Sequence, residues 1–171
     1  MMPQMTGPRS TWALSLLLVV FVTGCSIEQR TDRNNDAPPP STRKQIVDVP
    51  GVARLPVFSS AVRSGDLIFL SGSIGAVPGV SPPTLVEGGV VPETRQTMEN
   101  IRQVLAAAGA TMADIVKCSV FIADMADYAQ VNEVYLEFFP TDPPARSALG
   151  ANGLALGAAV EIECIAAVPE G

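Results

Sequence analysis

Apolar residues follow two different spacings after about residue 46, and each spacing predicts a type of secondary structure. The run GDLIFLSG, residues 65–72, is short, rich in β-forming residues and framed by turn residues, which is typical of a strand. The run VKCSVFI, residues 116–122, alternates apolar with polar residues and predicts a second strand. Its apolar positions are Val116, Cys118, Val120 and Ile122.

Helical spacing occurs twice, once before and once after the second of these strands. A first helix is expected to begin at Pro92 and to stop at Gly109. A second helix follows Asp127, and Pro140 ends it. The buried positions expected for the two helices are Met98, Ile101, Leu105, Ala108, Val131, Val134, Tyr135 and Phe138. We interpret the aromatic residues of the second helix, and Tyr128 at its start, as core residues rather than as a platform for a ligand.

The closing segment, residues 159–168, predicts a strand that places charge among apolar residues. Because side chains alternate along a strand, Glu161 and Glu163 share one face, and the apolar residues between them share the other. Strands before, between and after two helices indicate an α+β domain, a mixed sheet with both helices on one side. Two helices leave the second face of the sheet partly bare, so we expect self-association.

The first 45 residues differ in composition from the rest of the chain. The apolar run at residues 12–22 is too short to span a bilayer and fits the core of a signal peptide. The following VTGCS resembles a bacterial lipobox, in which Cys25 is lipidated; an ordinary signal peptide cleaved nearby is the alternative. We therefore expect a lipoprotein signal peptide over residues 1–24, a disordered tether with lipidated Cys25 over residues 25–45, and one domain over residues 46–171.

The residue after the lipobox cysteine bears on location. Ser26 resembles the pattern that sorts lipoproteins to the outer membrane of Gram-negative cells. We therefore expect a cell-envelope protein that is lipid-anchored on the periplasmic side of the outer membrane. Acyl chains rather than charge would hold it there, because a net charge of -6 disfavours attachment to anionic lipid.

The composition excludes several kinds of chemistry. The chain has no histidine, which removes the usual general base at neutral pH and the commonest zinc ligand. The 3 cysteines show no CxxC spacing, and we expect no metal site. We interpret Cys118 and Cys164 as small core residues, and a disulfide between strands is the alternative left open. Eleven basic against 17 acidic residues, with no basic stripe, disfavour binding to nucleic acid.

Four blocks of sequence, taken in order, resemble the Rid family, also called the YjgF family. They are AVRSGDLIFLSG, TRQTMENIRQVLAAAGATMADIVKCSVFIADMADYAQVNEVYLEFF, PPARSALG and GAAVEIECIAAV, and the resemblance extends over residues 58–168. The resemblance implies a chorismate-mutase-like α+β fold assembled as a homotrimer, with a cleft at each subunit interface. It also implies hydrolysis of reactive 2-imino acids, or their enamine tautomers, to 2-keto acids and ammonia without a cofactor.

Matched position by position, the resemblance implies roles for five residues. Arg146 is the signature arginine, whose guanidinium holds the substrate carboxylate through two parallel hydrogen bonds. Glu161 matches the glutamate that positions water for attack on the imine carbon. Ser71 and Asn132 match polar residues of the cleft. Phe58 stands where the better-studied deaminases have a tyrosine, so one hydrogen bond to substrate or water is lost.

Each assignment has a structural alternative. Arg146 could form a salt bridge across the trimer, and Glu161 and Glu163 could line a trimer channel, which is the interpretation we favour for Glu163. Ser71 and Asn132 could cap turns or strand ends. At the level of function, the alternative is a noncatalytic module that binds a small carboxylate or holds partner proteins at the envelope. Endoribonuclease activity, attributed to some relatives, is disfavoured by the acidic composition and the lack of histidine.

Overall fold

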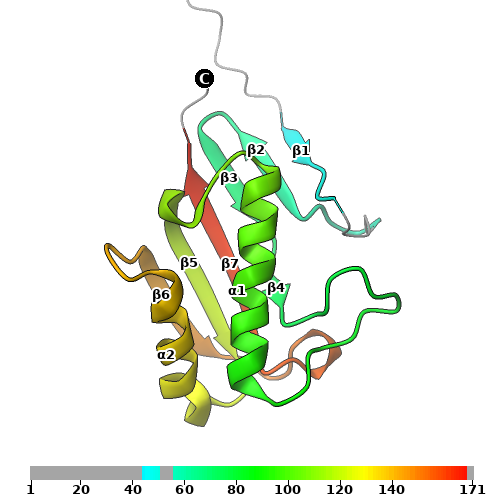
Figure 1. The fold of residues 1–171 in the computed structure, drawn as a ribbon, viewed down its shortest axis with the longest axis vertical. Coiled ribbons are helices and arrows are strands. Elements are labelled where there is room, and N and C mark those ends of the chain that lie inside the picture. The colour runs from blue at the N-terminus through cyan, green and yellow to red at the C-terminus, as the bar shows by residue number, and fades with distance from the viewer. Residues whose placement is uncertain (1–43, 51–55, 169–171) are drawn as a thin grey trace, which may run out of the picture. The chain divides into compact units, whose positions relative to one another are not determined.

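Residues 44–50 and 56–168 are described in the computed structural model of the chain (Figure 1). The strands of this part are β1 (Gln45–Val47), β2 (Ala61–Ser64), β3 (Leu67–Leu70), β4 (Ser73–Ile74), β5 (Ile115–Ile122), β6 (Ala145–Gly150) and β7 (Val160–Ala167). Its helices are α1 (Val90–Ala107) and α2 (Tyr128–Phe138), with short 3-10 turns η1 (Met112–Asp114), η2 (Met125–Asp127) and η3 (Ala155–Gly157). The predicted signal peptide, Cys25 and the tether up to residue 43 lie outside the described residues.

The strands form one mixed sheet with the order β1-β2-β3-β7-β5-β6, and β4 pairs with β7 beside this path. Neighbouring strands are antiparallel except β5 and β6, which run parallel. A parallel return needs a crossover, and α2 provides it between β5 and β6. Figure 1 shows α1 and α2 on the same side of the sheet. The predicted α+β class, a mixed sheet with two helices on one face, is confirmed.

The helix α1 begins and ends close to its predicted limits. It covers Val90–Ala107, with Pro92 in the first turn, where a missing backbone N–H costs nothing. The predicted stop is also found, because Gly109 takes a positive φ of 74° and the N–H of Ala110 donates to the carbonyl of Leu105 over 2.8 Å. The face of α1 turned to the sheet is fully buried at Met98, Ile101 and Leu105.

The strand β5 carries the predicted alternation with one local shift. Cys118 and Ile122 are fully buried against the helices, as expected. The register with β7 is irregular between Ile115 and Lys117, so Ile115 takes the buried side. Val116 is 47% exposed, and its predicted place on the apolar face is wrong.

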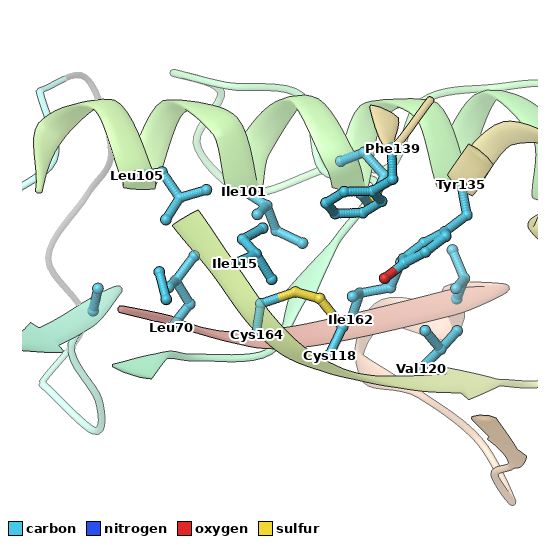
Figure 2. Close-up of a cluster of buried hydrophobic side chains, with 14 of the residues drawn as sticks. Leu70, Ile101, Leu105, Ile115, Cys118, Val120, Tyr135, Phe139, Ile162 and Cys164 are labelled. Atoms are coloured by element: carbon cyan, nitrogen blue, oxygen red, sulfur yellow. A yellow bond between two sulfur atoms is a disulfide. The ribbon is translucent and has the colours of Figure 1, made fainter. Parts of the chain in front are cut away.

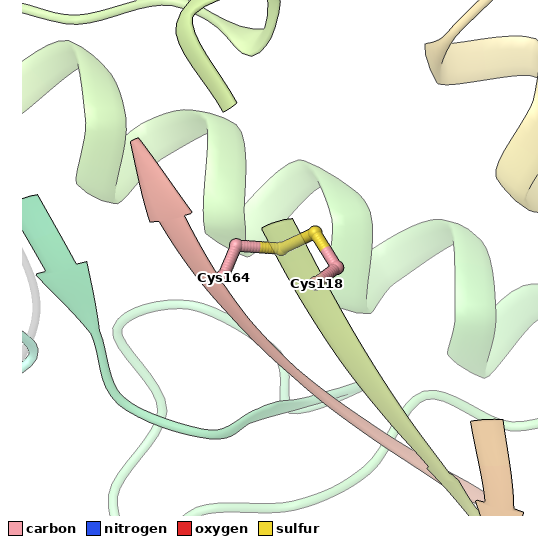
Figure 3. Close-up of a disulfide and its surroundings, with 2 residues drawn as sticks. All are labelled: Cys118 and Cys164. Carbon is pink, nitrogen blue, oxygen red and sulfur yellow. A yellow bond between two sulfur atoms is a disulfide. The ribbon is translucent and has the colours of Figure 1, made fainter. Parts of the chain in front are cut away.

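A disulfide joins the two central strands inside the core (Figures 2 and 3). Cys118 of β5 and Cys164 of β7 are direct partners in the antiparallel register, with their Cα atoms 4.1 Å apart. Both are buried, and Figure 2 shows the bridge among Ile101, Ile115 and Ile162. The preferred interpretation of these cysteines as unbonded core residues is therefore wrong, because the register places their side chains opposite one another on the same face.

The second face of the sheet is uncovered in the single chain. Leu67 and Phe69 of β3 are 38% and 42% exposed, and Leu149 of β6 is 46% exposed. These side chains point away from the helices, since their neighbours along each strand point toward them. We call this surface the open face. No helix between residues 44 and 168, the gap at 51–55 aside, combines the length and apolar character needed to cross a bilayer.

Candidate functional site

Arg146 lies on the edge strand β6, on the side of the sheet that carries the helices. The parallel register pairs Arg146 with Cys118 of β5, so the two side chains share a face. Cys118 is buried toward the helices, which directs Arg146 toward α2. The neighbours of Arg146 are small, and an edge strand leaves one side of its side chain open. The fold therefore presents a guanidinium at the border between α2 and the edge of the sheet.

Two tyrosines of α2 hold this guanidinium. Nη2 of Arg146 donates a hydrogen bond to the hydroxyl of Tyr128 over 3.2 Å. The guanidinium carbon also lies 5.8 Å from the ring centroid of Tyr128 and 4.8 Å from that of Tyr135, within cation–π range. In residues 44–50 and 56–168, no carboxylate forms a salt bridge with Arg146. The cation is thus oriented by aromatic rings, and its charge is left without a counter-ion in the described chain.

Two polar atoms on the same side of α2 are buried without a partner. Asn132 follows Tyr128 by one turn and precedes Tyr135 by one turn, so the three residues form one stripe. Oδ1 of Asn132 and the hydroxyl of Tyr135 have no hydrogen-bond partner among the described residues. Such atoms are rare in folded proteins, and they point to a water or ligand that completes their bonding.

Burial keeps the phenol of Tyr135 neutral. Desolvation raises the pKa of Tyr135 from 10.0 to about 12, and the nearby charge of Arg146 acts in the opposite direction. Figure 2 shows its hydroxyl directed from α2 toward the strands. The stripe therefore offers a neutral hydroxyl and an amide oxygen beside a cation, a combination suited to a small anion that also carries an N–H group.

Glu161 lies on the other face of the sheet, in close contact with a glycine. It is the register partner of Ile74 in β4 and of Phe121 in β5. A Cβ atom built on Gly72 would stand only 1.9 Å from Oε1 of Glu161, so the carboxylate rests against the bare Cα of that glycine. The carboxylate forms no hydrogen bond or salt bridge within the part of the chain that the structure describes, and it is free to bind a water or a ligand.

One chain does not bring Arg146 and Glu161 together. Arg146 shares the helix face with Cys118, whereas Glu161 pairs with Phe121, three positions further along β5 and on the open face. An odd number of positions along a strand reverses the side on which a residue lies. A site that uses both residues therefore requires Glu161 from a second copy of the chain.

The three other predicted site residues divide between the same two regions. Asn132 lies in the stripe of α2 beside Arg146. The Ser71 hydroxyl donates to the carbonyl of Ser59 over 2.7 Å, and its N–H donates to the carbonyl of Ser60 over 3.0 Å. Ser71 thereby fixes the segment that carries Phe58, which is 49% exposed. Ser71 and Phe58 thus belong to the region of Gly72 and Glu161, and the bonds of Ser71 are those of a strand-end cap.

Glu163 lies on the open face, away from the helices. It lines a hollow of about 180 Å³ together with Phe69, Lys117, Ser119 and Ile165. Nζ of Lys117 donates to the hydroxyl of Ser147 over 2.8 Å at the side of this region. The interpretation of Glu163 as a charge that lines a trimer channel stays a prediction.

Two residues of this region were not identified as functional from the sequence. The sequence predicts a core position for Tyr128, which is wrong, because its side chain is 38% exposed and bonds to Arg146. Glu93 signals only a helix start in the sequence, yet it is 7% exposed and accepts a 2.8 Å hydrogen bond from the N–H of Ala159. That bond anchors the chain two residues before Glu161. The sequence gives no sign of this bond, because Glu93 and Ala159 lie far apart along the chain.

Metal chemistry has no candidate site in the described residues. Between residues 44 and 168, apart from the gap at 51–55, no three His, Cys, Asp or Glu side chains gather closely enough to hold a metal ion.

The mixed sheet with two helices on one face defines a class of small α+β proteins. The family described as Endoribonuclease L-PSP matches residues 52–168, and the chain belongs to that family. A chloroplastic Reactive Intermediate Deaminase A of Arabidopsis thaliana is 38% identical over 127 residues, which are 74% of this chain and 67% of that protein. The 2-iminobutanoate/2-iminopropanoate deaminase of Mus musculus is 40% identical over 124 residues, 72% of this chain and 90% of that protein.

Solved structures show the same fold. The crystal structure of a Yersinia pestis protein of unknown function, assigned to the conserved Rid family, superposes with a TM-score of 0.69 at 34% identity. The match covers 74% of this chain and 100% of that one. A Thermotoga maritima structure described as a putative endoribonuclease gives a TM-score of 0.67 at 34% identity, covering 74% and 98% of the two chains. The resemblance to the Rid family found in the sequence is confirmed.

Proposed function

We propose that this protein hydrolyses reactive 2-imino acids, or their enamine tautomers, to 2-keto acids and ammonia. The observation that carries the proposal is Arg146, a guanidinium oriented by two tyrosines and without a carboxylate partner in the described chain. A planar guanidinium binds a carboxylate through two parallel hydrogen bonds, which lysine cannot reproduce. Relatives named Reactive Intermediate Deaminase A and 2-iminobutanoate/2-iminopropanoate deaminase, at 38% and 40% identity, support the same activity.

The reaction requires the protein to orient the substrate and a water and to accept a proton. The carboxylate of the substrate binds Arg146, and the carbon of the protonated imine is already electrophilic. Glu161 holds a water and accepts a proton as the water oxygen bonds to that carbon. The resulting carbinolamine releases its nitrogen as ammonia, and the C=O bond of the keto acid forms. Orientation and proton transfer account for the acceleration, so histidine is not needed.

The site forms between copies of the chain in this proposal. The opposite faces occupied by Arg146 and Glu161 support it, as does the exposed apolar surface of the open face. The assembly we propose is the homotrimer that the sequence resemblance implies, with the open faces turned inward and three equivalent sites at the borders.

The location proposed for the protein is the cell envelope, with a lipid on Cys25 and the domain on the periplasmic side of the outer membrane. The disulfide between Cys118 and Cys164 supports it, because such bonds persist in oxidising compartments and are rare in the cytosol. A Cys25→Ser variant is expected to lose incorporation of labelled fatty acid and to leave the membrane fraction. Labelled fatty acid that is still incorporated in the variant contradicts lipidation at this residue.

The activity is tested with full-length protein and an imine generated in place by an amino-acid oxidase. Wild type is expected to accelerate keto-acid release, and Arg146→Ala is expected to equal buffer. Arg102→Ala is the matched control, because Arg102 is an exposed arginine of α1 that pairs with Glu99. It is expected to match wild type.

Two outcomes decide against the proposal. Equal rates for wild type, Arg146→Ala and buffer exclude the deaminase. If a small carboxylate then raises the melting temperature of wild type without being consumed, the noncatalytic binding module replaces it. The endoribonuclease activity in the family's description is not proposed, because the net charge of -6 opposes the approach of RNA.

A further inference from the structure

The hydroxyl of Tyr128 has a hydrogen that no described residue accepts. A guanidinium carries only donors, so in the 3.2 Å contact Arg146 donates and the oxygen of Tyr128 accepts. The hydrogen of the phenol itself is then available to a second acceptor. Within residues 44–50 and 56–168 no hydrogen bond has Tyr128 as donor, and the side chain is 38% exposed.

The position of this hydrogen follows from its contact with Arg146. The oxygen of Tyr128 lies beside Nη2, which is one of the nitrogens that bind a carboxylate in the paired geometry. A carboxylate seated on the guanidinium therefore has one oxygen next to the phenol. Accepting a bond from a cation also polarises the phenol, which makes its O–H a stronger donor.

We infer that Tyr128 is a specificity-determining residue that donates a third hydrogen bond to the carboxylate held by Arg146. The inference rests on the proposed function, because it concerns the carboxylate of the same substrate. It gives α2 a phenol that can bond to the substrate, whereas Phe58 has no hydroxyl to offer.

A purely structural role makes different predictions. If the hydroxyl only orients Arg146, its loss changes binding of charged and neutral ligands together, because the arginine shifts for both. If it donates to the carboxylate, its loss weakens the anion much more than the amide, because a hydrogen bond to a charged oxygen is the stronger of the two. Tyr128→Phe separates the two cases, since it keeps the ring and its cation–π contact at 5.8 Å and removes only the hydroxyl.

The test measures binding of 2-oxobutanoate and of its neutral amide to full-length protein by calorimetry. Tyr128→Phe is expected to weaken 2-oxobutanoate about tenfold, the typical effect of one hydrogen bond to a charged group. Its affinity for the amide is expected to stay within about twofold of wild type. In imine hydrolysis the same variant raises KM about tenfold with kcat nearly unchanged, because the bond is present in ground and transition states alike.

The control is Glu133→Ala, which alters an exposed residue of α2 that is not three or four positions from Tyr128, Asn132 or Tyr135. It is expected to bind both ligands as wild type does. Equal 2-oxobutanoate affinity in Tyr128→Phe and wild type, or an equal loss for anion and amide, overturns the inference and leaves the deaminase proposal intact. Failure of wild type to bind 2-oxobutanoate, the keto-acid product, overturns the inference, and the imine hydrolysis assay then decides the deaminase proposal separately.

Discussion

Gly72 is a glycine because of its neighbour rather than because of its own backbone. Its φ does not lie in the left-handed region, so an alanine would meet no backbone strain there. The obstacle is the carboxylate of Glu161, whose Oε1 stands 1.9 Å from the place a Cβ would take. Because Gly72 has no Cβ, the carboxylate of Glu161 can occupy that space.

Gly72→Ala is therefore expected to displace the carboxylate and to reduce imine hydrolysis about 100-fold, as misplaced catalytic groups do. The free energy of unfolding is expected to change little, because the atoms that must move are the end of the flexible side chain of Glu161. Gly79→Ala is the control, since its Cβ meets nothing within 4 Å, although its φ of +74 costs roughly 1–2 kcal/mol in strain. Wild-type activity in Gly72→Ala would show that the position of Glu161 is not critical.

The titration of Tyr135 gives a second prediction at this scale. Burial raises its pKa to about 12, above the 10.0 of the unfolded chain. A folded-state pKa that is raised adds stability below the unfolded value, and this contribution is lost as pH rises from 10 toward 12. The free energy of unfolding is expected to fall over that range.

Tyrosinate absorbance checks this directly, because the chain has only 2 tyrosines. Tyr135→Phe is expected to remove the phenol that ionises at about pH 12 and to flatten the alkaline loss of stability. If the variant still shows a phenol that ionises at about pH 12, the raised pKa does not belong to Tyr135.

The sequence predicts the role of a residue only where strand alternation or the family resemblance points to it. The alternation in β7 placed Glu161 and Glu163 on one face, and Arg146 was found through the family resemblance. The role of Tyr128 was missed because helical spacing shows which residues share a face, but not which strand that face will meet. Only the parallel pairing of β6 brings Arg146 opposite Tyr128.

At the scale of elements, the disulfide fixes β5 to β7, the two strands on which the core is built. It closes a loop with a sequence separation of 46 that contains all of α2 and β6. Restricting the unfolded chain in this way stabilises the fold by about 4 kcal/mol in the chain-entropy account.

Replacing both cysteines by alanine is expected to lower the free energy of unfolding by about 2–4 kcal/mol. Denaturant unfolding of the variant and of wild type, each with and without reductant, provides the measurement. Reductant is expected to destabilise wild type under unfolding conditions and to leave the variant unchanged. Identical curves for wild type in both conditions would contradict the bond.

The elements that could be predicted are those with strong periodic patterns. α1, α2, β5 and β7 follow their apolar spacing closely. β6 could not be predicted, because the small residues of ARSALG carry no strand signal and the strand exists by pairing with the free edge of β5. The register of Cys118 with Cys164, and the shift that exposes Val116, are also properties of pairing rather than of either strand alone.

At the scale of the whole molecule, the open face is the feature that a single chain leaves unexplained. Apolar side chains such as Phe69 are exposed there, and charged Lys117 and Glu163 line a shallow hollow among them. Large uncovered apolar surfaces generally meet a partner. In the assembly proposed above, a second copy of the chain on this face would also supply the carboxylate of Glu161 to Arg146.

Phe69→Asp is accordingly expected to convert the assembly into single chains and to abolish activity with it. Light scattering is expected to give three times the chain mass for wild type and one chain mass for the variant. Leu136→Asp is the matched control, because Leu136 is 56% exposed on α2 and lies on the helical side. A trimer that survives Phe69→Asp would mean that the open face is not the contact.

The most direct test of a shared site is complementation between two inactive chains. Arg146→Ala and Glu161→Ala are co-expressed with different tags, and each is also purified alone as an inactive, folded assembly. Because an intact site needs Arg146 from one copy and Glu161 from its neighbour, equal mixing is expected to restore about one quarter of wild-type activity. A mixture as inactive as either variant alone would contradict a site built from the opposite faces of two sheets.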